Sequence, residues 1–276
     1  MAVALLSLAV VDWPSPVALA TRARWAASLS VSGGSWHPRV VQERETAIAG
    51  PPNTGVEGPV TVHARFNRPT TVGDLLVAAV IDGVQTSGTT QPTILLPHWT
   101  LGRDVIGGNT ADGGTGGYAT GGLQSAIYFY PDNPGGLLSL PVVDVPRGTA
   151  SDVTVVLAEL SGVPEKVSVD VTGGSTSGPT VRTDSTESAV YTDESTTGRP
   201  DLVLAAFTNG GNAPNGERFT YSRGWHLIGQ NTAAGDIDEP VLFDYRLQQQ
   251  PGVAGETMHN LGAYPGDNCA SIVALD

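Results

Sequence analysis

A buried-strand pattern occurs twice in this chain, and this repetition restricts the folds that the chain can adopt. Residues 73–80 read GDLLVAAV, and residues 201–207 read DLVLAAF. Each copy starts with an Asp beside a turn-forming residue and continues with β-branched and aliphatic side chains over a length too short for a helix. We therefore predict two equivalent buried strands. Neither is followed by the Gly-rich turn and helix that an α/β enzyme needs.

The segments that follow the first copy also recur after the second, at offsets of about 114 to 127 residues. The matching pairs are Trp99 with Trp225, residues 127–130 with 241–245, and residues 153–160 with 269–275. A four-element unit therefore occurs twice, and a difference in loop length explains the variation in offset.

The composition favours an all-β protein. The 276 residues include 35 glycines and 20 prolines, charged residues make up 15%, and hydrophobic residues make up 40%. Many turns and few charges are typical of short strands rather than helices, and the apolar content is sufficient for a core. We predict a jelly-roll-like or lectin-like antiparallel β-sandwich with an internal two-fold strand repeat, preceded by an N-terminal extension.

The repeat also predicts domain boundaries. We expect an N-terminal docking segment or arm over residues 1–55 and a sandwich over residues 56–276, with halves at about 60–163 and 189–276. Each half contributes only about four strong strands, too few to bury two faces, so we expect one sandwich formed from both halves. We expect residues 189–192 to form a short edge strand.

The charge balance disfavours two classes of partner. The formal net charge is −13, and Lys166 is the only lysine among 14 basic residues. Nucleic-acid binding needs clustered Lys and Arg, and anionic membranes attract basic surfaces, so we expect neither partner. Residues 2–11 are apolar, but ten residues cannot span a bilayer. We interpret them as a strand or buried arm, with a signal peptide as the alternative.

Two regions are candidates for binding. The N-terminal segment concentrates Trp and Arg, the residue types that most often dominate protein interfaces. The candidate docking residues are Trp13, Arg22, Arg24, Trp25 and Trp36. The alternative is that these Trp side chains fill the protein's own core. The second region is the Gly-rich stretch 107–122, which we interpret as a surface loop in which Tyr118 could contact a ligand.

No pattern in the sequence indicates a catalytic, cofactor or metal site. The five histidines form no HExxH pattern, no serine lies in a GxSxG turn, and no twelve-residue calcium loop is present. The single cysteine, Cys269, lies in an apolar strand pattern typical of a small buried hydrophobe. We therefore predict a non-enzymatic protein. A glycan hydrolase stays open as an alternative, because only a separation measured in space can identify its carboxylate pair.

The succession GDLLVAAV, Trp99-Thr100-Leu101, AIYFYPDNPGG, VTVVLAELSGV, DLVLAAF and Gly224-Trp225 resembles a β-sandwich domain of minor tail proteins from actinobacterial phages. Related domains occur in secreted bacterial surface proteins. The resemblance covers about residues 60–276 and rests on order and hydrophobic pattern. It implies a virion structural or host-recognition module, and it brings no catalytic residues.

From this resemblance we expect a phage virion protein, most simply a minor tail or tail-tip component located in the virion. Its partners would be other virion proteins, further copies of itself, with a homotrimer as one arrangement, and glycans of the host surface. Two alternatives stay open. The chain could be a capsid decoration protein, or it could be a secreted bacterial carbohydrate-binding module.

Overall fold

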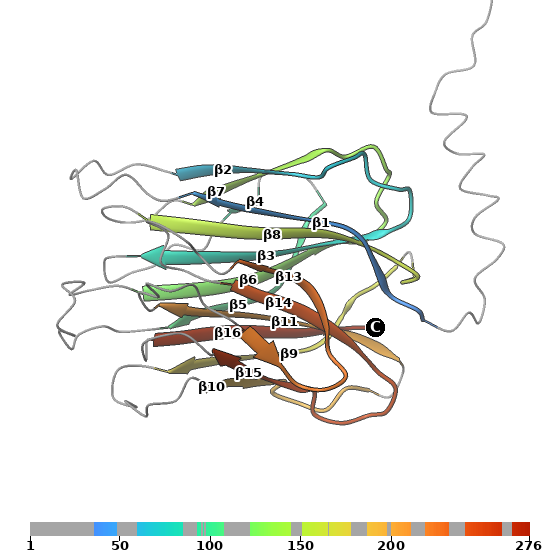
Figure 1. Ribbon diagram of the computed structural model, residues 1–276. Helices are drawn as coiled ribbons and strands as arrows, with labels where there is room; N and C mark the ends of the chain where they lie inside the picture. Colours follow the sequence, from blue (N-terminus) through green and yellow to red (C-terminus); the bar gives the residue numbers. More distant parts are fainter. Residues whose placement is uncertain are drawn as a thin grey trace, which may run out of the picture. The chain divides into compact units, whose positions relative to one another are not determined.

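The two recurring strands lie at the centre of the computed structural model (Figure 1). β3 (Leu75–Val84) is the middle strand of one five-stranded antiparallel sheet, and β11 (Asp201–Gly210) is the middle strand of another. The side chains from Leu75 to Ile81 are buried on both faces of β3, and those of β11 are buried from Asp201 to Thr208. Burial on both faces explains why these strands are apolar without alternation.

The structure describes the chain from Trp36 onward, where its compact unit begins. The described residues are 36–48, 60–84, 93–94, 96, 98–107, 122–144, 151–164, 166–177, 187–197, 200–210, 219–231, 241–260 and 267–276. They contain strands and turns, and they form no helix long and apolar enough to cross a membrane.

The strands form four antiparallel sheets. The first large sheet has the order β1 (Arg39–Ile48), β8 (Ser151–Ser161), β3, β6 (Gly122–Tyr130), β5 (Thr100–Gly107). The second has the order β13 (His226–Asn231), β14 (Val241–Gln248), β11, β16 (Asp267–Leu275), β9 (Val169–Ser177). The small sheets are β2 (Val60–Arg65), β7 (Ser139–Asp144), β4 (Thr93–Ile94), and β10 (Glu187–Tyr191), β15 (Gly255–Asn260), β12 (Phe219–Tyr221).

The predicted two-fold repeat is confirmed strand by strand. Read in reverse, the second large sheet is β9-β16-β11-β14-β13, and each of these strands comes eight places after its counterpart in β1-β8-β3-β6-β5. The small sheets β2-β7-β4 and β10-β15-β12 obey the same rule. The chain is therefore two tandem sandwiches of identical strand order, each with one large and one small sheet.

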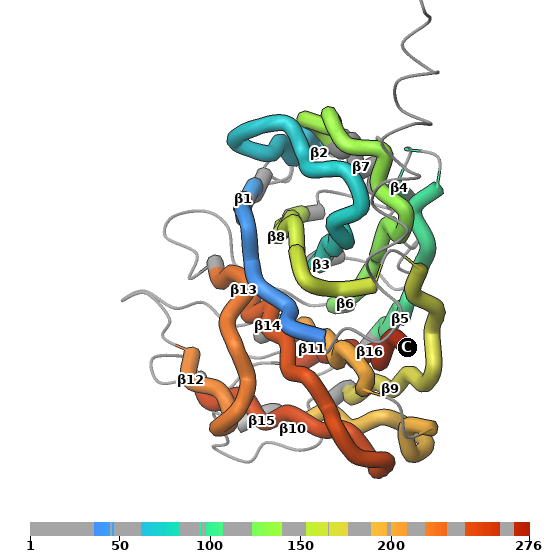
Figure 2. The backbone as a smooth tube through the Cα atoms, turned by 90° about the vertical axis from the view of Figure 1, so that its right-hand side faces the viewer, coloured from blue at the N-terminus to red at the C-terminus, as the bar shows by residue number. Residues whose placement is uncertain are grey.

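Figure 2 shows the sheets as successive layers, with a small sheet on each outer side and the two large sheets between them. Alternate residues of β3 face different cores. Leu75 and Val77 pack in the central core against the second large sheet, whereas Leu76 and Ala78 pack in the first outer core against β2. The second outer core lies between β11 and the sheet β10-β15-β12.

The two repeats share a β-bulge at the same place, which aligns them residue by residue. The pairing of β5 with β6 shifts register between Leu101 and Arg103, and that of β13 with β14 shifts between Leu227 and Gly229. Just before the bulge, Thr100 pairs with Phe129, and His226 pairs with Tyr245. Phe129 and Tyr245 are thus equivalent, which corrects our sequence match of these strands by two residues.

The structure confirms the all-β class and the β-sandwich, and it changes the way in which the halves combine. We expected one sandwich built from both halves. Instead, each half adds its own small sheet and forms its own outer core, so that the central core joins two sandwiches. The sandwich also begins before residue 56, because β1 pairs with β8 from Arg39 to Ile48.

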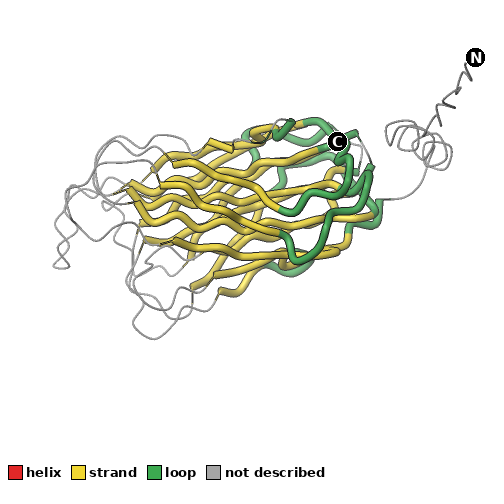
Figure 3. The backbone as a smooth tube through the Cα atoms, turned by 90° about the horizontal axis from the view of Figure 1, so that it is seen from above, coloured by secondary structure: helices red, strands yellow, loops and turns green. Residues whose placement is uncertain are grey.

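The predicted edge strand at residues 189–192 is present as β10, which lies at the edge of its small sheet. Strands of both repeats run along the same direction of the molecule, and the described turns gather at one end (Figure 3). The more specific prediction of a jelly roll stays a prediction.

Candidate functional site

Of the residues predicted to bind a partner or ligand, the structure describes Trp36. Its side chain is half-buried and packs against the central core. The other five candidates lie outside the described residues: Trp13, Arg22, Arg24, Trp25 and Tyr118.

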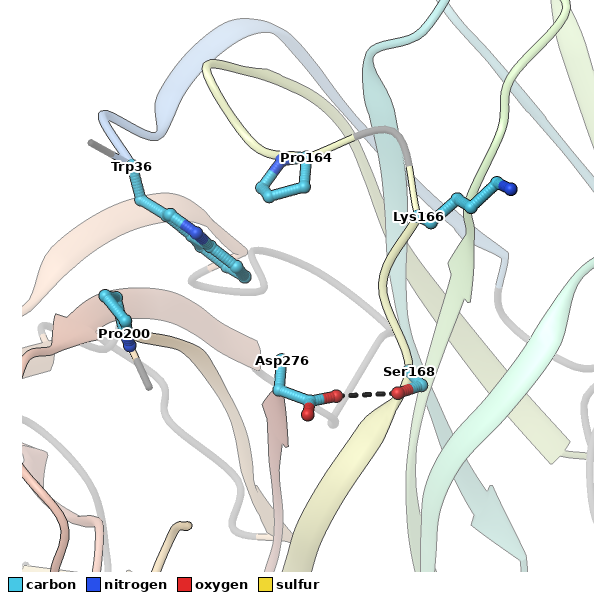
Figure 4. A pocket seen from close by; sticks show the side chains of 6 residues that line it. All are labelled: Trp36, Pro164, Lys166, Ser168, Pro200 and Asp276. Atoms are coloured by element: carbon cyan, nitrogen blue, oxygen red, sulfur yellow. Dashed lines mark hydrogen bonds between the residues drawn. The ribbon is translucent and has the colours of Figure 1, made fainter. Parts of the chain in front are cut away.

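Trp36 also lines a shallow pocket of about 430 Å³ at the end of the molecule where the two repeats are joined (Figure 4). The lining residues are Trp36, Pro164, Lys166, Ser168, Pro200 and Asp276. The Trp36 ring extends between Pro164 and Pro200, and the Lys166 ammonium points away from the other side chains. This arrangement offers a flat apolar surface with a polar margin.

The polar margin of this pocket is occupied by an internal hydrogen bond. Ser168 Oγ donates to Asp276 Oδ1 at 2.6 Å, and the two backbones exchange hydrogen bonds of 3.1 and 3.0 Å. These contacts fix the turn before β9 to the end of β16. The pocket can therefore receive a flat apolar group beside this fixed polar pair.

A second candidate site lies inside the second outer core, where a group of charged side chains replaces apolar ones. Asp244 and Arg246 alternate with the side chains of β14 that enter the central core, so both face the small sheet. Glu256 comes from β15, the middle strand of that sheet. Asp244 has no exposed surface and Glu256 is 1% exposed. We call Asp244, Arg246 and Glu256 the charged group.

The charged group has few hydrogen bonds for its depth. Glu256 Oε1 accepts a hydrogen bond of 2.7 Å from the Ser222 backbone, and Arg246 donates one of 2.5 Å to Gln248. The Arg246 guanidinium carbon lies 5.2 Å from the centre of the Trp225 ring, a cation–π distance. In the charged group and its Trp225 neighbour, the buried atoms without a partner are both Asp244 carboxyl oxygens, Glu256 Oε2, Arg246 Nε and Trp225 Nε1.

Burial dominates the electrostatics of the charged group. It raises the pKa of Asp244 well above the usual value, and the Glu256 carboxylate raises it further. Burial likewise raises the pKa of Glu256 to about 7, although hydrogen bonds and Arg246 oppose the shift. Burial lowers the pKa of Arg246. Both carboxyl groups thus hold protons more tightly than in water.

The first repeat shows that the fold does not require charges at these positions. The bulge alignment makes Tyr128 the equivalent of Asp244 and Tyr130 the equivalent of Arg246. Both tyrosines belong to the first outer core, where Tyr130 packs against Trp99 with ring centres 5.7 Å apart. An aromatic pair in one repeat therefore corresponds to the cation–π pair of Arg246 and Trp225 in the other.

Glu159, a buried carboxyl of the first repeat, has a hydrogen bond on each of its oxygens. Its two oxygens accept hydrogen bonds of 2.5 Å from Gln42 Nε2 and from the Thr71 backbone. Burial raises the pKa of the neighbouring Asp74 to about 6, and a hydrogen bond with Glu159 and its charge add to the shift. Because these contacts join β1, β8 and the turn before β3, we assign this pair a structural role.

The remaining reactive residue types hold the fold together. Cys269 is fully buried, its thiol donates to the Val105 carbonyl at 3.2 Å, and burial raises its pKa to about 12. His98 stacks on Tyr130 and His226 packs on Tyr245, each next to the tryptophan of its own repeat. Among the described residues, no three His, Cys, Asp or Glu side chains gather into a group that could hold a metal ion.

Sequence reasoning missed the charged group, although one signal was present. Residues 241–245 read VLFDY, and Asp244 interrupts a run that is otherwise buried on both faces. Glu256 gives no such signal. Strands of an outer sheet alternate between polar and apolar residues, and the sequence does not say which face a given polar residue occupies.

No protein-family model matches the chain, and no curated protein is significantly similar to it.

Proposed function

We propose that this chain is a non-enzymatic structural protein of a phage virion, a minor tail or tail-tip component that contributes to recognition of the host surface. The observation that carries the proposal is the tandem sandwich with the strand succession that resembles the tail-protein domain. Its two large sheets pack through one apolar core. Such a body holds its surfaces in a fixed relation, as a building block of a particle must.

The packing of this body favours a role in assembly over a role as an enzyme whose active site opens and closes. The central strands are buried on both faces, and the shallow pocket beside Trp36 exposes a flat surface rather than a deep cleft. Many copies in one particle would act together, so that weak contacts with host glycans could add to a useful avidity.

Mass spectrometry of purified virions from the phage that encodes the chain tests the proposal. We expect peptides of the chain in the particle, and we expect them in the tail fraction when tails and capsids are separated. Peptides in the capsid fraction would indicate a decoration protein instead. Particles free of the chain would contradict both assignments.

A carbohydrate-binding module of a secreted bacterial protein is the second candidate, and Trp36 is the observation that favours it. The apolar face of an aromatic ring can receive the flat face of a sugar, and the Trp36 ring lies between two prolines at the surface. The purified monomer should then bind a polysaccharide in pull-down assays, and Trp36→Ala should abolish binding. A monomer that binds no polysaccharide would contradict this function.

A further inference from the structure

The second outer core contains charged side chains at positions where the first repeat has uncharged ones, so the fold does not require charges there. Asp244 and Glu256 bring two carboxyl groups into a mostly apolar space. The neighbouring side chains come from four strands: Val190 of β10, Val203 and Phe207 of β11, Ile272 of β16, and Phe219 of β12. An ionised carboxylate is costly in such surroundings unless it is paired and hydrogen-bonded.

The compensation inside this core is incomplete. Arg246 accompanies the two carboxyl groups and donates a hydrogen bond to Gln248. The carboxyl group of Asp201 is also buried, and Asp201 lies on the same face of β11 as Val203. Three carboxyl oxygens of the pair remain without a partner, two on Asp244 and one on Glu256. Protonation would remove the charge of each carboxyl group, and it would give the group an O–H donor that can pair with a neighbouring acceptor. It would therefore reduce both the cost of the buried charge and the number of unpartnered oxygens.

The position of Glu256 links the ionisation of the carboxyl pair to the small sheet β10-β15-β12. β15 is the middle strand of its small sheet and pairs with β10 on one side and β12 on the other. Charge repulsion between Glu256 and Asp244 acts across the gap between β15 and β14. The small sheet would therefore be pushed away from the large sheet as a unit.

We propose that Asp244 and Glu256 form a proton-binding pair that keeps the sheet β10-β15-β12 closed on the second sandwich, and that loss of their protons at alkaline pH loosens this sheet while the first sandwich stays closed. The first repeat carries Tyr128 at the position of Asp244 and Leu140 at the position of Glu256. This second equivalence follows from the matching backbone hydrogen bonds of Phe66 to Leu138 and of Thr192 to Ala254.

The sign of the pH dependence follows from the tighter proton binding of the folded state. Burial holds the pKa of Glu256 at about 7 and that of Asp244 well above its usual value. An unfolded Asp or Glu loses its proton near pH 4. The stabilising effect is thus complete below about pH 4 and is lost as the pH rises to about 7 and beyond.

Hydrogen–deuterium exchange of the full chain at pH 5.5 and pH 8.5 tests the proposal, with rates corrected for the intrinsic effect of pH. We expect amides of β10, β12 and β15 to exchange at least about tenfold faster at the higher pH, which corresponds to one pKa unit. The first repeat also contains buried carboxyl groups, Asp82 and Glu159, and Glu159 is hydrogen-bonded to Gln42 of β1 and to the Thr71 backbone rather than to the small sheet. Amides of β2 and β7 should therefore change by less than about threefold. Equal changes in both small sheets, or none in either, would overturn the proposal.

Two variants localise the effect. Asp244→Asn and Glu256→Gln each remove one titrating group with little change of shape, so each should reduce the difference between the two pH values by at least about threefold. Glu194→Gln, at an exposed position beyond β10, is the control and should leave the difference unchanged. If a variant does not fold, the comparison of the two small sheets in the original chain still decides the question. An unchanged difference in both folded variants would contradict the assignment to this pair.

Discussion

Gly162 lies at the turn that leaves the first repeat, and it has a backbone conformation that other residues seldom adopt. Its φ is 72°, and its carbonyl accepts a hydrogen bond of 3.0 Å from the His37 backbone. A Cβ placed there would lie 2.2 Å from the His37 carbonyl oxygen. The start of β1 can approach this turn only because no side chain is present.

We predict that Gly162→Ala lowers the free energy of unfolding by about 2 to 4 kcal/mol, because it adds a backbone clash to the strain of a left-handed residue. Gly136→Ala is the matched control, since Gly136 has a φ of 76° and no atom within 4 Å of the added Cβ. It should cost only about 1 kcal/mol. Urea unfolding of both variants measures the difference, and equal losses would show that the approach of β1 is unimportant.

Asp74, which is half-buried, and Glu159, which is fully buried, provide a test of a coupled carboxyl pair in the first repeat. Burial is the largest cause of the raised pKa of Asp74, followed by its hydrogen bond with Glu159 and the charge of Glu159. Glu159→Gln should therefore lower this pKa from about 6 while leaving it above the usual value. Titration of the Asp74 carboxyl by NMR measures the shift. Glu194→Gln should have no effect, and a pKa still at about 6 in Glu159→Gln would exclude the coupling.

The strands differ in how well their hydrogen bonds are protected. β3 and β11 have a neighbour on each side and a core on each face, whereas β4 (Thr93–Ile94) and β12 (Phe219–Tyr221) are short strands at the edges of small sheets. Local opening is cheapest where few apolar contacts are lost. The large sheets should therefore open only with global unfolding.

We predict that amides of β3 and β11 exchange at least about a thousandfold more slowly than those of β12 at pH 6, where the charged group retains much of its protonation. Hydrogen exchange resolved by NMR or mass spectrometry gives the rates strand by strand. β6 and β14, which are also interior strands, should behave like β3 and β11. Similar rates in β3 and β12 would mean that the layers do not open independently.

The central core makes the two repeats dependent on each other. One face of each large sheet is apolar and is covered by the other large sheet, with Leu75 and Val77 on one side and Leu202 and Leu204 on the other. A repeat produced alone would expose this face. Exposed apolar faces of such size lead to association or to loss of fixed packing.

We predict that residues 167–276, produced alone, aggregate or bind a hydrophobic dye, and that the chain with both repeats does neither. The same fragment carrying Leu204→Thr and Phe243→Thr is the control, because these changes make the exposed face more polar and should reduce the dye signal by at least about half. Light scattering and dye fluorescence measure both effects. A fragment that stays monomeric and does not raise the fluorescence of the dye would show that each sandwich folds independently of the other.

Local patterns were enough to predict the strands and their repetition. Residues 73–80 and 201–207 are apolar on both faces, and the alternation between positions 60 and 66 marks β2 as an outer strand, because a strand's pattern records how many of its faces are buried. Cys269 was likewise recognisable as a buried residue from its neighbours in β16.

The pairing of layers and the charged group were decided by tertiary structure. Asp244 and Glu256 are 12 residues apart and lie on different sheets, and the sequence does not say that their side chains face the same core. The sequence also did not predict the number of layers. The strands of the small sheets are short and resemble loops in the sequence, and their pairing with β7 and β15 is visible only in the structure. A sequence records the burial of each residue, whereas the identity of the residues that share a core depends on how the chain folds back on itself.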